Sequence, residues 1–564
     1  FVYTMLYNKV NGISEKKNFT VVLFFVYLIL ALFLYRNTIG CRLVTDAQNW
    51  LVLYDTIGWS GIINSFGDQA LHPGYHFFFF LSYKIFGTNE VGWYLLFTSL
   101  HALNALLIYL VFNKYLALIK ISDNNLISLS ASFLFLVSPY QTEAVVWGAT
   151  IHYLLVTAAV LITINLVILY IQKRKLFYII LILFLFCFAI LSSELALCIP
   201  FIITLLFLFI KGDTTPLPKK EIFIRILLPL LLLTSFYFAA NKLILGSWVG
   251  HYGASTHLKF SIGELISNFV KYVFKFLFFG NFFAGTLKEK FTILTDTKYV
   301  IYLTGGILIF FVFLYLSIKR FRTSINKSIV LFLCFGAALL PVLNLDTALL
   351  PDMNLFFNTL PIEGDRLGYL ASAFIFLSLC VFLFSIYRKG AFIIVLLFSV
   401  ISVFLLNKNL ASWKNAGIIQ NALEKNFDWE DSDRLFILNI PDNFNGAYLY
   451  RDNGSSSKFK TALQLKENTI INGDVYEILH FNMTSLDNGI ITEIIDSVTL
   501  KVNFEQWGNW WWRGGIGASD YENDLYKVDI DEWSHAYIIT FKQKRPEDIF
   551  IYQTGDSWQQ VKEF

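Results

Sequence analysis

Long apolar runs between residues 19 and 406 constrain the fold of this chain more than any other feature of its sequence. About 20 consecutive apolar residues cross the hydrocarbon core of a bilayer as a helix. We expect about eleven such spans, at residues 19–36, 91–112, 126–138, 151–171, 176–192, 197–210, 223–241, 299–318, 328–345, 367–387 and 391–406. Of the 564 residues, 56% are hydrophobic, which excludes an ordinary soluble protein and favours a mainly α, polytopic membrane helix bundle.

The chain changes character after residue 410. A helix is expected over residues 413–426, and beyond it apolar and polar residues alternate between turns rich in Asn, Asp and Gly, as they do in β-strands. The stretches LFILNI, VTLKVNF and AYIITFKQK carry this alternation. We therefore predict a transmembrane domain at 1–410 and a soluble β-rich domain at 411–564.

Clusters of Lys and Arg at alternate loops predict the orientation in the membrane, because such clusters stay on the cytoplasmic side. Examples are residues 173–175, 319–322 and 388–389. They predict a multi-pass protein of the cytoplasmic (inner) membrane with a cytoplasmic amino terminus and a periplasmic tail. Residues 264–283 place two lysines on one face, so we expect an amphipathic helix in the outer interface rather than a span.

The first outer loop, residues 37–90, contains the longest polar stretch before residue 213. It carries Asp46, Asp55, Asp68, His72 and His76. Ionisable groups held beside a membrane are costly and therefore mark candidate functional sites. We interpret Asp55 and Asp68 as solvated or turn-forming, with substrate binding as the alternative for Asp68, and keep the others as candidates for binding a substrate or for catalysis.

Two further charged residues are expected on the same face of the membrane. Arg366, in EGDRLGY, offers a planar fork of donors that suits a phosphate, although a salt bridge to Glu363 or Asp365 would equally explain it. Glu143, in PYQTEAVVW, is expected to tie the outer loops together, with substrate binding as the alternative. His72 and His76 could bind a donor phosphate or an acceptor, and a structural role fits them as well.

Four segments occur in an order that resembles the GT-C glycosyltransferases, closest to the bacterial branch of the protein O-mannosyltransferases and their TPR-linked relatives. They are residues 72–112 (containing LHALNALL), 138–155 (SPYQTEAVVWGATIHYLL), 192–197 (SSELAL) and 339–373 (containing EGDRLGYLASA). The resemblance implies inverting transfer of a sugar from a polyprenyl-phosphate donor to a hydroxyl of a protein or glycan acceptor, at an outward-facing site.

The same resemblance implies that a carboxylate of the first outer loop acts as the general base. Asp46 stands at the matching place, where the family often carries two adjacent acids. Here the sequence is Thr45-Asp46-Ala47, and His72-Pro73 stands where Arg-Pro is commoner. The alternative role of Asp46 is an N-cap for a helix over residues 47–56.

Two rival functions remain open: a catalytically inert GT-C subunit of an envelope complex, and a transporter of lipid-linked sugars. No Asp/His cluster has the spacing of a metal site, so neither a divalent metal nor another cofactor is expected. The sequence has no nucleotide-binding glycine motif, and nothing in it indicates a nucleic-acid partner. The expected partners are the lipid-linked sugar, the acceptor, membrane lipids and other proteins of the envelope.

Overall fold

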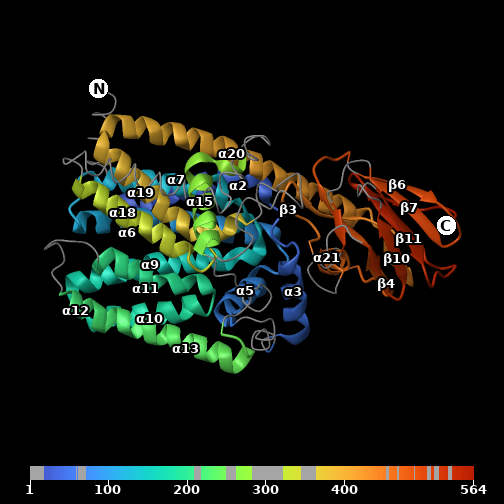
Figure 1. The fold of residues 1–564 in the computed structure, drawn as a ribbon, viewed down its shortest axis with the longest axis horizontal. Coiled ribbons are helices and arrows are strands. Elements are labelled where there is room, and N and C mark those ends of the chain that lie inside the picture. The colour runs from blue at the N-terminus through green and yellow to red at the C-terminus, as the bar shows by residue number, and fades with distance from the viewer. Residues whose placement is uncertain are drawn as a thin grey trace.

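The structure is a computed structural model that describes residues 18–58, 60, 71–208, 218–248, 262–282, 322–343, 364–451, 457–466, 469–487, 489–504, 510–512, 520–530 and 536–564. It consists of a helical bundle and a β-rich part, which the long helix α20 (Arg388–Lys425) joins end to end (Figure 1). The predicted mainly helical part with a β-rich C-terminal part is therefore confirmed. The expected span at 299–318 and the candidate residue Asp68 lie outside the described residues.

The bundle contains fourteen described α-helices before α20. In chain order they are α2 (Phe19–Tyr35), α3 (Asp46–Ile57), α5 (Pro73–Phe86), α6 (Glu90–Leu118), α7 (Asn124–Leu136), α8 (Thr142–Val146), α9 (Ile151–Lys173), α10 (Leu176–Ile190), α11 (Ile199–Ile203), α12 (Lys219–Ile222), α13 (Leu228–Leu245), α15 (Ile262–Phe278), α18 (Arg322–Leu339) and α19 (Tyr369–Ile386). Single turns of 3-10 helix matter for the site: η3 (Pro139–Gln141), η4 (Gly148–Thr150), η5 (Glu194–Cys198) and η10 (Asp365–Gly368).

The expected number of eleven spans is not confirmed. Six of the described helices are long and apolar enough to cross a membrane: Phe19–Thr38, Glu90–Leu118, Gly148–Lys173, Lys219–Leu245, Asp365–Ile386 and Arg388–Lys425. Four more are apolar but shorter: Asn124–Leu136, Leu176–Ile190, Glu194–Leu208 and Asn326–Leu339. The 13 residues of α7, for example, cover about 20 Å, whereas the hydrocarbon core is about 30 Å thick.

Helix α15 differs from the prediction of an interfacial amphipathic helix. The side chain of Lys275 is only 1% exposed and forms an ion pair with the carboxylate of Asp365, which is completely buried. This lysine therefore faces a carboxylate inside the protein instead of water. The spacing of the lysines indicated a polar face correctly, but not what covers that face.

The β-rich part contains three sheets and the helix α21 (Lys458–Lys466). The strand orders are β13-β12-β1-β4, β6-β7-β11-β10-β9 and β3-β2-β5-β8. The strands are β1 (Arg434–Ile437), β2 (Ile440–Phe444), β3 (Ala447–Tyr448), β4 (Asp474–Glu477), β5 (Leu479–Met483), β6 (Ile490–Ile494), β7 (Thr499–Phe504), β8 (Trp510–Trp512), β9 (Tyr521–Glu522), β10 (Tyr526–Ile530), β11 (Ala536–Phe541), β12 (Ile549–Thr554) and β13 (Ser557–Gln560).

Two pairs of consecutive strands run from one sheet into another. Only two residues separate β1 from β2, and one residue separates β4 from β5. Strand β1 pairs in parallel with β4 in the first sheet, with Leu435 opposite Val475. Strand β2 pairs in parallel with β5 in another sheet, with Ile440 opposite His480. The sheet of β6, β7, β11, β10 and β9 is antiparallel throughout its described pairings.

The β-rich part contacts the bundle through the helices of the first loop and through α20. Helix α21 packs on α3, while β2 and β3 pack on α20. In Figure 1, α3 and α5 accordingly lie at the end of the bundle nearest the β-rich part. Helix α3 of the first loop therefore contacts both the bundle and the β-rich part.

Gly148, in η4, packs closely against the segment that precedes α3. Its N–H donates to the carbonyl of Arg42 at 2.9 Å, and a Cβ at this position would lie 2.4 Å from that carbonyl oxygen. We predict that Gly148→Ala lowers the free energy of unfolding by about 1–3 kcal/mol, because the two segments would have to separate. Thermal unfolding of the purified protein in detergent measures this.

Gly280→Ala is the matched control, because a Cβ there would meet its nearest neighbour at 3.6 Å, an ordinary contact. We expect a melting temperature close to that of the wild type for this control. Equal melting temperatures for the two alanine variants would contradict the close approach at Gly148.

Candidate functional site

Asp46 lies in the first turn of α3 with 53% of its side chain exposed. The predicted helix is confirmed, but it begins at Asp46, so that Thr45 occupies the N-cap position. A carboxylate in a first helical turn is stabilised by the partial positive charge of the helix amino terminus. Its Oδ1 lies 3.8 Å from the ammonium of Lys458, the first residue of α21.

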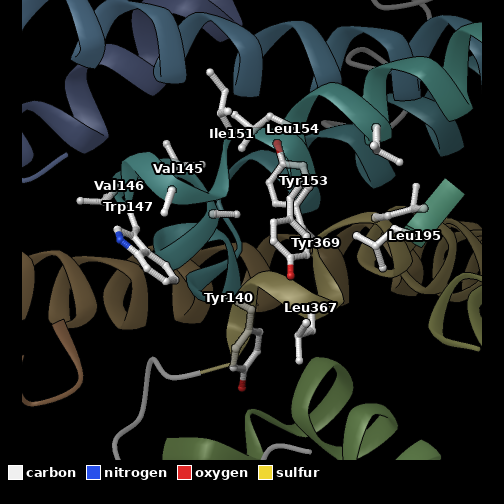
Figure 2. Close-up of a cluster of buried hydrophobic side chains, with 14 of the residues drawn as sticks. Tyr140, Val145, Val146, Trp147, Ile151, Tyr153, Leu154, Leu195, Leu367 and Tyr369 are labelled. Carbon is white, nitrogen blue, oxygen red and sulfur yellow. The ribbon is translucent and has the colours of Figure 1, made fainter. Parts of the chain in front are cut away.

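Trp147 connects the Asp46 turn with Arg366. The indole N–H of Trp147 donates to the Thr45 hydroxyl at 3.0 Å, and the guanidinium of Arg366 lies 5.1 Å from the centre of the indole ring. Trp147 itself is buried among apolar side chains of the segment from η3 to α9, as Figure 2 shows. The structure thus connects Arg366 and the residue next to Asp46 to one tryptophan.

Glu143 binds Arg366 and the β-rich part at the same time. One carboxylate oxygen pairs with Nη1 of Arg366, and the other accepts from the backbone N–H of Arg366 at 2.8 Å. The hydroxyl of Tyr448, in β3, donates to the first oxygen at 3.0 Å. Glu143 is completely buried and Arg366 is 17% exposed. Glu143 is therefore a partner of Arg366 that the sequence analysis did not name, and it ties distant segments together. Of the two partners that were expected, Asp365 pairs with Lys275 and Glu363 lies outside the described residues.

A second buried ion pair adjoins the first. Asp365 precedes Arg366 in η10 and pairs with Lys275, whose ammonium also lies 5.2 Å from the centre of the Tyr140 ring. Sequence reasoning missed this pair, because Lys275 and Asp365 are 90 positions apart. The two lysines on one face of residues 264–283 were the only signal, and they did not identify the partner.

The two histidines of the first loop lie at the start of α5, and His76 packs against α3. His76 is 7% exposed, and its Nδ1 lies 2.8 Å from the hydroxyl of Tyr54, on α3. Its ring also contacts the rings of Trp50 and Tyr75. Burial lowers the pKa of His76 to about 4, so the imidazole is neutral at pH 7. His72 occupies the N-cap position of α5 without a side-chain capping bond.

The side chains of the site can support proton transfer. Within the described ranges, no group of three His, Cys, Asp or Glu side chains is arranged to hold a metal ion. What the site offers is an accessible carboxylate, a guanidinium fixed by a buried carboxylate, and neutral imidazole and phenol groups next to aromatic rings. Tyr448, Lys275 and Lys458 are members of this site that the sequence analysis did not single out.

Glu143 is expected to be decisive for stability. We predict that Glu143→Gln destabilises the protein by about 3–5 kcal/mol, because the guanidinium of Arg366 would lose its buried counter-charge. Tyr448→Phe should cost about 1.5–3 kcal/mol, since it removes a hydrogen bond to a charged group. Thermal unfolding measures both effects, and limited proteolysis should release the β-rich part faster from each variant.

Tyr552→Phe serves as the control for Tyr448→Phe. The exposed Tyr552 hydroxyl donates to Gln559 at 2.9 Å on the surface of the same part of the chain, so its loss should change the stability by less than about 0.5 kcal/mol. A Tyr448→Phe variant as stable as this control would contradict the proposed tie between the two parts.

His76 should make the stability depend on pH. Its pKa is near 6.5 in the unfolded chain and about 4 in the folded protein, so the unfolded state takes up the proton first as the pH falls. The contribution is therefore complete above pH 6.5 and is lost between pH 6.5 and 4, by about 3 kcal/mol. His76→Asn keeps an acceptor for Tyr54 but does not titrate.

The measurement compares the melting temperatures of the wild type and His76→Asn from pH 7.5 to pH 4.5. We expect the wild type to lose more stability over this range than the variant does. Parallel curves for the two proteins would show that His76 is not held neutral by burial.

Comparisons with known proteins assign no family to the chain. No protein-family model matches it, and no curated protein is significantly similar to it. The function therefore has to be inferred from the residues of the site, together with the ordered motifs of the sequence.

Proposed function

We propose that this protein is a membrane glycosyltransferase of the GT-C type. It would move a sugar from a polyprenyl-phosphate donor to a hydroxyl of a protein or glycan acceptor at the outer face of the inner membrane. The observation that carries the proposal is Asp46, a half-exposed carboxylate in the first turn of α3. Its turn is anchored through Trp147 at the end of a helical membrane bundle.

In the proposed reaction, Asp46 takes the proton of the acceptor hydroxyl while the hydroxyl oxygen attacks the anomeric carbon of the donor sugar. The bond between the anomeric carbon and the phosphate oxygen breaks, and its electron pair leaves with the phosphate. The products are the glycosylated acceptor, with inverted anomeric configuration, and polyprenyl phosphate. The proton stays on Asp46 until it is released to water.

The negative charge of the departing phosphate needs compensation. Arg366 is the proposed contact, since its guanidinium lies over the ring of Trp147, whose N–H binds Thr45, and part of the Arg366 side chain is exposed. Glu143 fixes Arg366 through one contact with the guanidinium and one with the backbone N–H. Lys458 adds a second positive charge next to Asp46, which the sequence resemblance does not include.

The contact between Asp46 and Lys458 also favours the second candidate, an inert subunit that keeps the fold. In that case the carboxylate serves to hold α21 of the β-rich part against α3. In the transferase the Asp46 carboxylate accepts a proton, whereas in the inert subunit it only holds α21 in place. The substitution Asp46→Asn therefore distinguishes the two functions.

We predict that Asp46→Asn lowers the transfer rate roughly 10²–10⁴-fold, because an amide cannot accept the proton. The loss of stability should stay small, because the Asp46 side chain is 53% exposed and its contact with Lys458 is long, at 3.8 Å. The assay incubates purified protein in lipid nanodiscs with a panel of polyprenyl-phosphate sugars and an acceptor, and measures the release of polyprenyl phosphate. A parallel melting curve checks the fold.

Asp55→Asn is the matched control, because it makes the same change on the same helix, nine residues or about 13 Å further along. Its carboxylate accepts from the hydroxyl of Tyr83 and has no role in the proposed reaction. We expect a transfer rate near that of the wild type. A wild-type rate for Asp46→Asn refutes Asp46 as the base, and no release from any donor by the wild type supports the inert subunit.

A further inference from the structure

Trp50 stands one helical turn after Asp46 on the same face of α3. Residues four positions apart on a helix are neighbours on its surface, so the carboxylate and the indole lie next to each other. The indole is half-buried and contacts the rings of Tyr75, His76 and Phe79 at centroid distances of 4.9, 5.4 and 5.5 Å. All three rings meet it nearly at right angles, which holds the indole in one orientation.

The hydroxyl of Tyr75 is the second unusual feature at this place. Tyr75 is 3% exposed, and within the described part of the chain its hydroxyl oxygen is buried without a hydrogen-bond partner. A buried hydroxyl with no partner is costly, so native structures rarely keep one unless water or a ligand meets it. Burial raises the pKa of Tyr75, and the nearby carboxylate of Asp46 adds to the rise, so the group stays a neutral O–H donor.

Gly74, the residue before Tyr75, packs closely against the end of α10 and so fixes the position of Tyr75. The N–H of Gly74 donates to the carbonyl of Leu191 at 2.9 Å, and a Cβ on Gly74 would lie 2.6 Å from the Ser192 hydroxyl oxygen. The ring of Tyr75 also lies 5.1 Å from that of His152, at the start of α9. The Tyr75 hydroxyl is therefore held in place by segments from α5, α9 and the end of α10.

We infer that Trp50 and Tyr75 form the subsite for the pyranose ring of the substrate, with the Trp50 indole as its apolar platform and the Tyr75 hydroxyl as its hydrogen-bond donor. Ligand sites generally combine aromatic walls with a few fixed polar groups, and this place has both next to an accessible carboxylate. The inference rests on the proposed glycosyl transfer for the role of the bound sugar. It goes further by naming the residues that select the sugar.

The test is the binding of free methyl hexopyranosides to the full-length protein in lipid nanodiscs, detected by saturation-transfer NMR. The panel contains the α-manno, β-gluco and β-galacto forms. We expect saturation transfer to at least one of them, its loss in Trp50→Leu, and its retention in Trp50→Phe, which keeps an aromatic ring. The absence of binding by the wild type, or wild-type binding by Trp50→Leu, overturns the inference.

Monodeoxy analogues of the bound glycoside test Tyr75. One of them should bind the wild type roughly two- to tenfold more weakly than the parent sugar, because one hydrogen bond is lost. Tyr75→Phe should bind that analogue and the parent equally well. Tyr83→Phe is the control, since it removes a hydroxyl two turns further along α5 and should keep the wild-type preference. A preference that survives in Tyr75→Phe overturns the role of the Tyr75 hydroxyl.

The two proposals fail in different ways. Asp46→Asn should still bind the glycoside, since the carboxylate takes part in transfer and not in the stacking. Sugar binding that depends on Trp50, without release of polyprenyl phosphate from any donor, supports the subsite and refutes the transfer. Transfer that proceeds normally in Trp50→Leu supports the transfer and overturns the subsite. If Trp50→Leu fails to fold, the deoxy-sugar preference of Tyr75→Phe decides the matter.

Discussion

Glu143 is a fully buried carboxylate on which three distant segments of the chain converge. Its oxygens bind the side chain and backbone of Arg366 and the hydroxyl of Tyr448, 223 and 305 positions away. A buried charge that lost these partners would be strongly destabilising, so the α8 turn, η10 and β3 must stay together. The guanidinium fixed in this way lies over Trp147, which in turn holds Thr45 at the start of α3.

The need of a buried charge for a partner also explains the contacts of the two adjacent charged residues in η10. Asp365 and Arg366 are adjacent in sequence, carry opposite charges and find their partners in different elements, Lys275 of α15 and Glu143 of α8. One turn of 3-10 helix thus anchors two parts of the bundle through buried charge pairs. Such pairs contribute more to a defined arrangement than to net stability, because desolvation offsets much of their attraction.

The β-rich part contributes two side chains to the candidate site. It supplies the Tyr448 hydroxyl to Glu143 and the Lys458 ammonium to the neighbourhood of Asp46. In the proposed function this means that the tail shapes the space into which donor and acceptor enter. The first loop contributes Trp50 of α3 and Tyr75 of α5, whose rings contact each other.

The sequence by itself determined the features that depend on local pattern. Apolar runs marked a helical membrane bundle, alternation marked a β-rich tail, and the helix after Thr45 was predicted to within one residue. The number of spans was not determined, because apolar runs such as that of α7 form helices too short to cross a bilayer. Only the tertiary structure decided that Lys275 pairs with Asp365 and that Tyr448 reaches Glu143. A buried charge needs a partner, but sequence spacing carries no information about which distant residue the fold brings to it.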